Sequence, residues 1–292
     1  MKRILLFILT NVAVLVVVTA IVSLLGLDTA YLKPHGLDLT ALAIFSLIWG
    51  MVGSVISLLM SKQIAKWTMK LQVIKAPHGP QENFIFDVVQ RLANQHGIKT
   101  PELAVYNDPT PNAFATGASK NSSLVAVSVG LLQQMNNDEI EGVIAHEMAH
   151  IVNGDMVTMT LVQGVMNAFV IFFSRIAAYA VQTAMGRDGE QIGGLVYYVV
   201  AFAFQILFGM LASLVVFGFS RHREYAADRG SAQMVGKAKM IAALKRLQQM
   251  QGTKKTNKAF ATMQISGSKS GMMELFRTHP PLEKRIAALR GA

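Results

Sequence analysis

Long apolar runs without a charged residue interrupt this sequence four times. The runs cover Ile4–Leu25, Leu39–Met60, Met156–Ser174 and Ile192–Ser220. About 20 apolar residues in a helix are enough to cross the roughly 30 Å hydrocarbon core of a bilayer. The pattern therefore predicts four transmembrane helices and a mostly α membrane protein. The first run also resembles a signal peptide ending near Ala20, but its apolar length favours an uncleaved anchor.

Basic residues flank these runs on one side. Lys2 and Arg3 precede the first run, and a group of lysines follows the second, namely Lys62, Lys66, Lys70 and Lys75. Residues 221–292 carry 15 basic and 4 acidic side chains. Because short loops rich in lysine and arginine stay in the cytoplasm, both termini are expected there. The net charge of +10 then reflects topology, and no nucleic-acid partner is expected.

The parts between the runs are expected to form one cytoplasmic α+β domain from two segments. Residues 1–60 and 156–220 would each hold two transmembrane helices, while 61–155 and 221–292 would fold together on the same side. A helix is predicted over 82–96 from its apolar spacing. Three short apolar stretches, at 103–106, 112–116 and 124–129, predict a small antiparallel sheet.

One predicted helix carries the candidate chemistry. It begins at Asn137 and runs to Gly154, and it contains the sequence His146-Glu147-Met148-Ala149-His150. Histidines four apart project from one helix face, so both imidazoles can bind one zinc ion. Glu147 lies beside them, where a general base for a water molecule is needed. The alternative is a pair of surface histidines without a ligand.

A zinc site of this kind needs a third protein ligand. The chain has no cysteine, so imidazole and carboxylate are the available ligands. Glu224 and Asp228 share a helix face just after the fourth run, and we assign Glu224 to the metal and Asp228 to holding a ligating imidazole. His222 remains the alternative ligand, and Asp155 is expected to be too close along the chain to reach back.

These motifs together resemble the HtpX-type branch of the membrane zinc metallopeptidases, which also includes the CAAX prenyl proteases. The resemblance covers nearly the whole chain: two apolar runs, the His146–His150 motif, two further runs, then Glu224-Tyr225-Ala226-Ala227-Asp228. It implies a zincin-like (gluzincin) catalytic domain with one Zn²⁺ per chain, Glu224 as third ligand and Asp228 behind it. It also implies a bacterial inner-membrane protease for quality control of membrane proteins under heat or envelope stress.

Two weaker motifs match the same family. Asn112-Ala113-Phe114 resembles its edge strand, which would pair with an extended peptide and place Asn112 near the scissile carbonyl. Thr278-His279-Pro280-Pro281 followed by Arg285 resembles its late motif, in which the histidine and the arginine stabilise the oxyanion. Without the family, Asn112 would be a turn residue and Arg285 a solvated charge.

The expected function is zinc-dependent cleavage of membrane proteins or unfolded polypeptides at the cytoplasmic membrane face. The site should lie close to the bilayer, since Gly154 directly precedes the third run and Glu224 lies four residues beyond the fourth. The alternative is a non-proteolytic membrane protein, either chaperone-like or metal-binding. An ion transporter is disfavoured, because the spans carry few polar groups, chiefly Gln163, Asn167 and Gln205.

Overall fold

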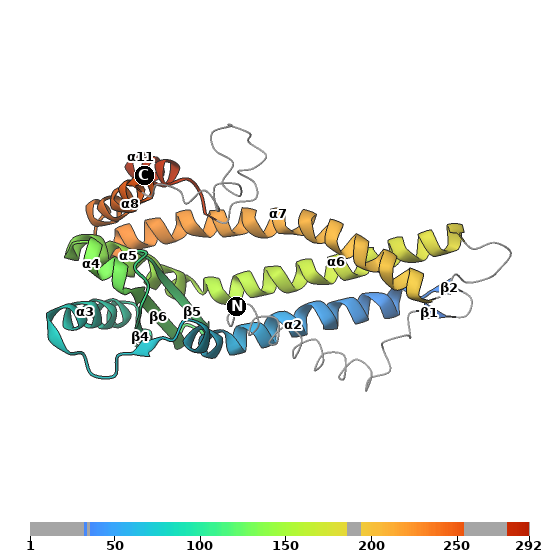
Figure 1. Ribbon diagram of the computed structural model, residues 1–292, viewed down its shortest axis with the longest axis horizontal. Helices are drawn as coiled ribbons and strands as arrows, with labels where there is room; N and C mark the ends of the chain where they lie inside the picture. The colour runs from blue at the N-terminus through green and yellow to red at the C-terminus, as the bar shows by residue number, and fades with distance from the viewer. Residues whose placement is uncertain (1–31, 34–35, 186–193, 254–278, 292) are drawn as a thin grey trace. The chain divides into compact units, whose positions relative to one another are not determined.

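The computed structural model describes residues 32–33, 36–185, 194–253 and 279–291 (Figure 1). The chain divides into two compact units. We call them the span unit, which comprises Met1–Leu59 and Thr158–Val216, and the sheet unit, which comprises Met60–Val157 and Phe217–Ala292. The domain boundaries expected from hydropathy and charge remain predictions.

Three long helices are apolar enough to cross a membrane. They are α2 (Leu39–Thr68), α6 (Asp155–Met185) and α7 (Gly194–Val235). They coincide with the second, third and fourth apolar runs, so these three predicted helices are confirmed as helices of sufficient length and hydropathy. The first run, Ile4–Leu25, lies outside the described residues, and the count of four spans remains a prediction.

Within the span unit, α2, α6 and α7 lie side by side (Figure 1). Leu42 and Phe45 of α2 are buried against Ile171 of α6. The two backbones come very close at Gly50, where an added Cβ atom would stand 2.4 Å from the backbone nitrogen of Ala168. Two short strands, β1 (Leu32–Lys33) and β2 (Gly36–Leu37), pair antiparallel before α2 begins.

The sheet unit contains a four-stranded sheet in the order β3-β4-β6-β5. Its strands are β3 (Gln72–Val73), β4 (Glu102–Tyr106), β5 (Ala113–Ser119) and β6 (Ser122–Ser128). The prediction of an antiparallel sheet is wrong for one pair, since β4 and β6 are parallel. The chain forms the hairpin β5–β6 and inserts β6 beside β4, which leaves β5 at the edge.

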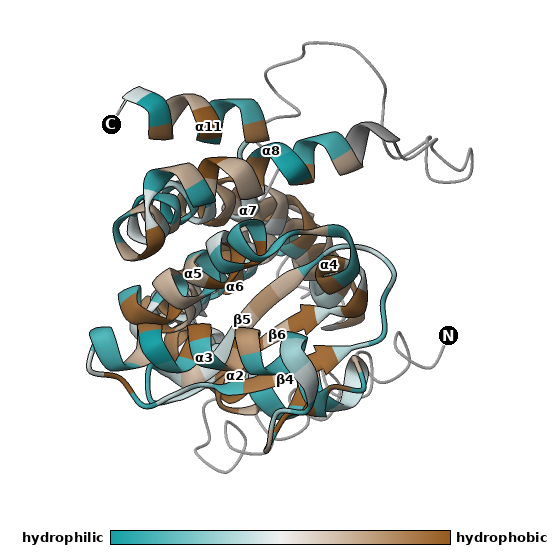
Figure 2. Cartoon of the chain, turned by 90° about the vertical axis from the view of Figure 1, so that its left-hand side faces the viewer, coloured by the Kyte–Doolittle hydropathy of each residue, from teal (hydrophilic) through white to brown (hydrophobic). Residues whose placement is uncertain are grey.

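Among the described residues, five helices complete the sheet unit, and those nearest the sheet form the core with one of its faces. They are α3 (Gly79–Gln95), α4 (Val129–Gln134), α5 (Asn137–Asn153), α8 (Lys237–Thr253) and α11 (Leu282–Gly291). The largest apolar cluster joins α3, β4, β6, α4, α5 and α8, with residues such as Leu92, Val125 and Ile144 fully buried. Figure 2 shows the corresponding pattern, with hydrophobic colour along β6 and alternating colours around α3. The core holds α5 rigidly against the sheet.

Candidate metal centre

Helix α5 presents two histidines toward one point. A capping box begins the helix, in which the Asn136 side chain accepts a hydrogen bond from the backbone of Glu139 and the Glu139 carboxylate accepts one from the backbone of Asn136. Gly154, with φ of 72°, ends it in the left-handed conformation. The Nε2 atoms of His146 and His150 lie 3.2 Å apart. A contact this short between ring nitrogens suits two lone pairs directed at a shared cation.

Glu224 of α7 completes a set of three ligand atoms. One carboxylate oxygen lies 3.5 Å from Nε2 of His146, and the other lies 3.4 Å from Nε2 of His150. Donor atoms held at about 2.1 Å around a tetrahedral zinc ion stand about 3.4 Å apart. The 3.2 Å between the two imidazole nitrogens, and the 3.5 and 3.4 Å from each of them to one of the two carboxylate oxygens, are close to this spacing. Each of the three residues offers a ligand atom within 4.8 Å of the other two. Two imidazoles and a carboxylate are also a donor set that zinc accepts.

Asp228 holds the first imidazole from behind. Its Oδ1 atom lies 3.0 Å from Nδ1 of His146, one helical turn from Glu224 on the same face of α7. Arg285 of α11 in turn donates two hydrogen bonds to Asp228, at 2.8 and 2.6 Å, and its Nη1 lies 3.1 Å from Glu224. Burial disfavours the charged imidazole, but the carboxylates of Asp228 and Glu224 outweigh it and raise the pKa of His146. The site thus attracts a positive charge.

Asp155 holds the imidazole of His150, a role that was not expected from the sequence. Its Oδ2 atom lies 2.6 Å from Nδ1 of His150, although it was expected not to reach back. The left-handed turn at Gly154 directs the chain back so that a carboxylate five residues on faces the ring. Asp155 is buried and pairs with Arg223 of α7. The signal in the sequence is an acid placed directly after a helix-ending glycine.

Glu147 faces a cleft beside the three ligand atoms. The cleft has a volume of about 390 Å³. Its polar lining residues are Asn112, His146, Glu147, Glu224, His279 and Arg285. Asn112 immediately precedes the edge strand β5 and lines the cleft together with Ala113 of that strand and His146. Glu147 is partly exposed, which leaves its carboxylate accessible to a water molecule or a peptide.

The structure also places the weaker candidates. His279 has 66% of its side chain exposed, and its Nδ1 lies 3.0 Å from Glu224. Arg285 is only 7% exposed, so its environment is a buried ion pair and not the solvated helix surface that the residue alone would suggest. His222, the alternative ligand, is exposed and is absent from the group of three that could hold a metal among the described residues.

Comparisons with known proteins show the family to which this chain belongs. Residues 81–292 match the family described as Peptidase family M48. The chain is 51% identical over 291 residues to a "Protease HtpX homolog" of Janthinobacterium sp. (strain Marseille), covering 99% of both chains. It is 49% identical over 293 residues to "Protease HtpX" of Shewanella oneidensis, again covering 99% of both.

A solved structure shares the fold. The crystal structure of S. mikatae Ste24p superposes with a TM-score of 0.66 at 15% sequence identity. The superposition covers 99% of this chain and 66% of that longer chain. At this identity the likeness concerns the fold alone.

Proposed function

Because this chain belongs to peptidase family M48, and is thus a multi-pass membrane metalloendopeptidase acting on polypeptides, we propose that its metal is zinc, held by His146, His150 and Glu224. The observation that carries the proposal is that each of these residues offers a ligand atom within 4.8 Å of the other two, with the two imidazole nitrogens 3.2 Å apart. Glu147 on the same helix supplies the general base. One zinc ion per chain accounts for all three ligands.

Bound zinc supplies Lewis-acid polarisation of the scissile carbonyl and of the attacking water. The Glu147 carboxylate accepts the proton of that water and then donates it to the leaving nitrogen of the peptide. No acyl-enzyme forms, because no nucleophilic side chain attacks the substrate. Glu147 adjoins His146 in sequence and lines the cleft with it, which suits a base that must reach water at the metal.

Two carboxylates keep the imidazoles ready to ligate. Asp228 accepts a hydrogen bond from the Nδ1–H group of His146, and Asp155 accepts one from the Nδ1–H group of His150. Each contact fixes the tautomer that leaves Nε2 unprotonated, and it also fixes the orientation of the ring. Asp228 and Asp155 therefore act as positioning residues.

The substrate binds as an extended strand along the edge strand β5. Its backbone pairs with β5 by strand addition, and the Asn112 side chain contacts the peptide near the scissile carbonyl. His279, exposed at the cleft, donates to the oxyanion of the tetrahedral intermediate. Arg285 already donates to Asp228, so it stabilises the developing negative charge chiefly through its own positive charge.

The site lies at the cytoplasmic face of a bacterial inner membrane, with four spans and both termini inside. Lysine and arginine placement supports this orientation. Glu224 follows the last uncharged run by only four residues, or about 6 Å of helix. The substrates are misfolded or damaged membrane proteins, cleaved in cytoplasmic segments near the bilayer. Quality control under heat or envelope stress is the physiological setting.

The test is cleavage of an unfolded, membrane-tethered substrate by detergent-solubilised wild type and Glu147→Gln, with zinc measured in both. We expect both to hold one zinc per chain and the variant to lose about 10²- to 10⁴-fold in rate, as loss of a general base implies. A variant that retains full activity would contradict the role of Glu147. Zinc-loaded wild type that is inert on several substrates would favour a chaperone-like protein.

A further inference from the structure

A polar cavity lies inside the span unit, away from any charged residue. Its volume is about 640 Å³. It is lined by α2, α6 and α7, with polar groups from Ser54, Ser57, Thr160, Gln163, Asn167 and Gln205 among apolar neighbours. Ser54 precedes Lys62, and Gln163 follows Asp155, by eight residues each, or about 12 Å of helix. These groups therefore lie within the hydrocarbon depth of a bilayer.

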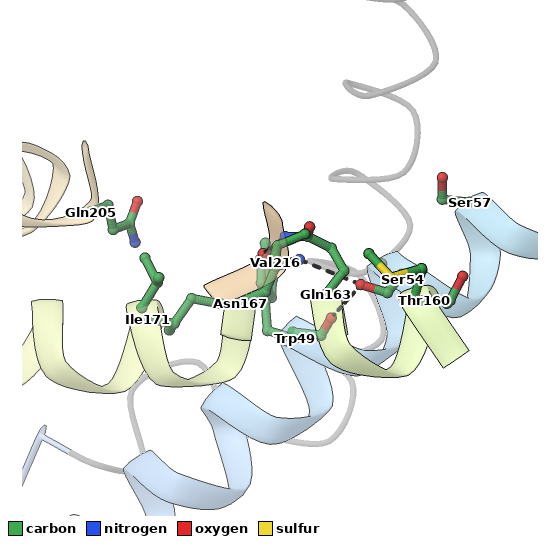
Figure 3. A pocket seen from close by; sticks show the side chains of 13 residues that line it. Trp49, Ser54, Ser57, Thr160, Gln163, Asn167, Ile171, Gln205 and Val216 are labelled. Atoms are coloured by element: carbon green, nitrogen blue, oxygen red, sulfur yellow. Dashed lines mark hydrogen bonds between the residues drawn. The ribbon is translucent and has the colours of Figure 1, made fainter. Parts of the chain in front are cut away.

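Three of these side chains form a chain of hydrogen bonds. Gln163 donates to Asn167 at 2.8 Å, Asn167 faces Ser54 at 3.4 Å, and the Ser54 hydroxyl donates to the backbone of Gly50 at 3.1 Å. Figure 3 shows this series on one side of the cavity. A primary amide has two N–H donors and an acceptor oxygen, so Gln163 and Asn167 keep unused hydrogen-bonding capacity.

Gln205 approaches the cavity from α7 without a partner. Figure 3 shows its amide directed toward Ile171 of α6. It makes no hydrogen bond to any residue that the structure describes. Gln205 lies near the middle of the uncharged run 192–220, where an amide without a hydrogen-bond partner is costly. An unpaired amide at this depth requires a partner from outside these three helices.

The cavity wall on α2 is open at Gly53. A Cβ atom added to Gly53 would meet none of the described residues within 4 Å, although Gly50 one turn earlier is closed by Ala168. Gly53 and Ser57 are four residues apart, a small-residue spacing that lets another helix backbone approach closely in a membrane. This wall of the cavity therefore allows another helix to approach closely and also offers hydrogen-bonding groups to it.

We propose that this cavity binds a membrane-spanning helix of the polypeptide substrate, one that carries a hydrogen-bonding side chain such as Asn or Gln. The inference rests on the proposed function and adds a second recognition site to it. A lipid chain offers no hydrogen bond at this depth, and the described lining offers no charge to an ion. A polar side chain on an otherwise apolar helix matches both features. Spans with exposed polar groups are typical of unassembled membrane proteins, since such groups normally face a partner.

The experiment uses two matched substrates in proteoliposomes. Both carry the same unfolded cytoplasmic segment, followed by a Leu/Ala span that either contains or lacks a central Asn. Wild type should cleave the Asn-containing substrate about three- to tenfold faster at limiting concentration, as interhelical hydrogen bonds in membranes imply. Gln205→Leu and Asn167→Leu should remove this preference. Neither should change cleavage of the same segment supplied as a soluble peptide.

Controls separate this proposal from the proposed function. Ile206→Leu, on a residue of α7 that does not line the cavity, should keep the preference. Equal preference in wild type, Gln205→Leu and Ile206→Leu would overturn the proposal while leaving the protease intact. If the soluble peptide is cleaved equally by wild type and Glu147→Gln, the proposed function itself fails.

Photo-cross-linking identifies the occupant directly. A benzophenone side chain at Gly53 should capture the span of the Asn-containing substrate more strongly than the span lacking Asn. Capture of residues 4–25 of the same chain, unaffected by excess substrate, would mean that the protein fills its own cavity and would overturn the proposal. Capture of neither, with the preference absent, would mean a water-filled cavity and the same conclusion.

Discussion

The two units of this protein treat polar side chains in opposite ways. In the sheet unit, buried charges contact one another directly: Arg285 lies 3.1 Å from Glu224 and 2.6 Å from Asp228. In the span unit, the cavity presents neutral amides and hydroxyls, and Gln205 has no partner among the described residues. Fixed, paired charges suit metal binding and stabilisation of developing charge. Neutral groups suit recognition of an uncharged helix, because burying a charge in lipid would cost far more.

The largest effect on zinc binding should come from replacing the proposed third ligand. Glu224→Gln removes a ligand charge and should weaken zinc binding by more than about 100-fold, beyond the usual cost of losing an outer carboxylate. The matched control is His222→Gln, two residues away and exposed, which should bind zinc normally. Chelator competition measures both. Equal losses, or a larger loss in the His222 variant, would make His222 the ligand.

A smaller effect should follow from breaking the contacts behind the histidines. Asp155→Asn and Asp228→Asn should each weaken zinc binding about 10- to 100-fold, because the imidazoles lose the acceptor that fixes their tautomer. Asp138→Asn, at the start of α5 and 68% exposed, is the control and should have no effect. Absorption spectra of the cobalt-substituted proteins should shift for the first two only. An unchanged spectrum and affinity in Asp155→Asn would contradict its positioning role.

In the span unit, two glycines of α2 have opposite surroundings and provide a matched pair of substitutions. Gly50→Ala should destabilise the protein by about 1–3 kcal/mol, since the new methyl group would meet backbone atoms of α6 that cannot move easily. Gly53→Ala, facing open space, should leave stability unchanged or slightly raised. Thermal unfolding in detergent measures the difference. Equal effects of the two substitutions would place α2 and α6 further apart than described.

Acidification should weaken zinc binding through His146 and His150 and should leave the neutral cavity of the span unit unchanged. The pKa of His150, like that of His146, is raised by its carboxylate neighbours despite burial, and only the neutral imidazole binds metal. Zinc affinity should therefore fall as the pH drops through the raised pKa, starting above the ordinary 6.5, by about tenfold per pH unit for each proton displaced. Competition with a chelator of known pH dependence measures this. The substrate preference set by the neutral cavity should not change over the same range.

The sequence determined much of the local structure. Apolar runs at 39–60, 156–174 and 192–220 predicted helices that the structure contains. The helix predicted from Asn137 to Gly154 is confirmed as α5, with Asn136 as its N-cap and Gly154 as its C-cap. The spacing of His146 and His150 already placed both on one face of it. Each of these features depends on neighbouring residues, because helix periodicity and capping act within a few residues along the chain.

Other features depended on which distant segments meet. Spacing alone left Glu224 and His222 both open, and only the packing of α7 against α5 brings the former to the histidines. The parallel pairing of β4 with β6 arises because the hairpin β5–β6 joins the sheet through its second strand, beside β4, which alternation of side chains does not encode.

The cavity around Gln205 also depends on distant segments, whereas the contact of Asp155 with His150 spans only five residues and depends on the left-handed Gly154. Asp155 reaches His150 through one left-handed residue, and the polar groups near Gln205 come from three helices far apart in the sequence. The sequence thus determined which helices form and which chemistry they carry. The tertiary structure decided which side chains touch, because contacts between distant segments depend on the combined packing of the whole core and not on any local pattern.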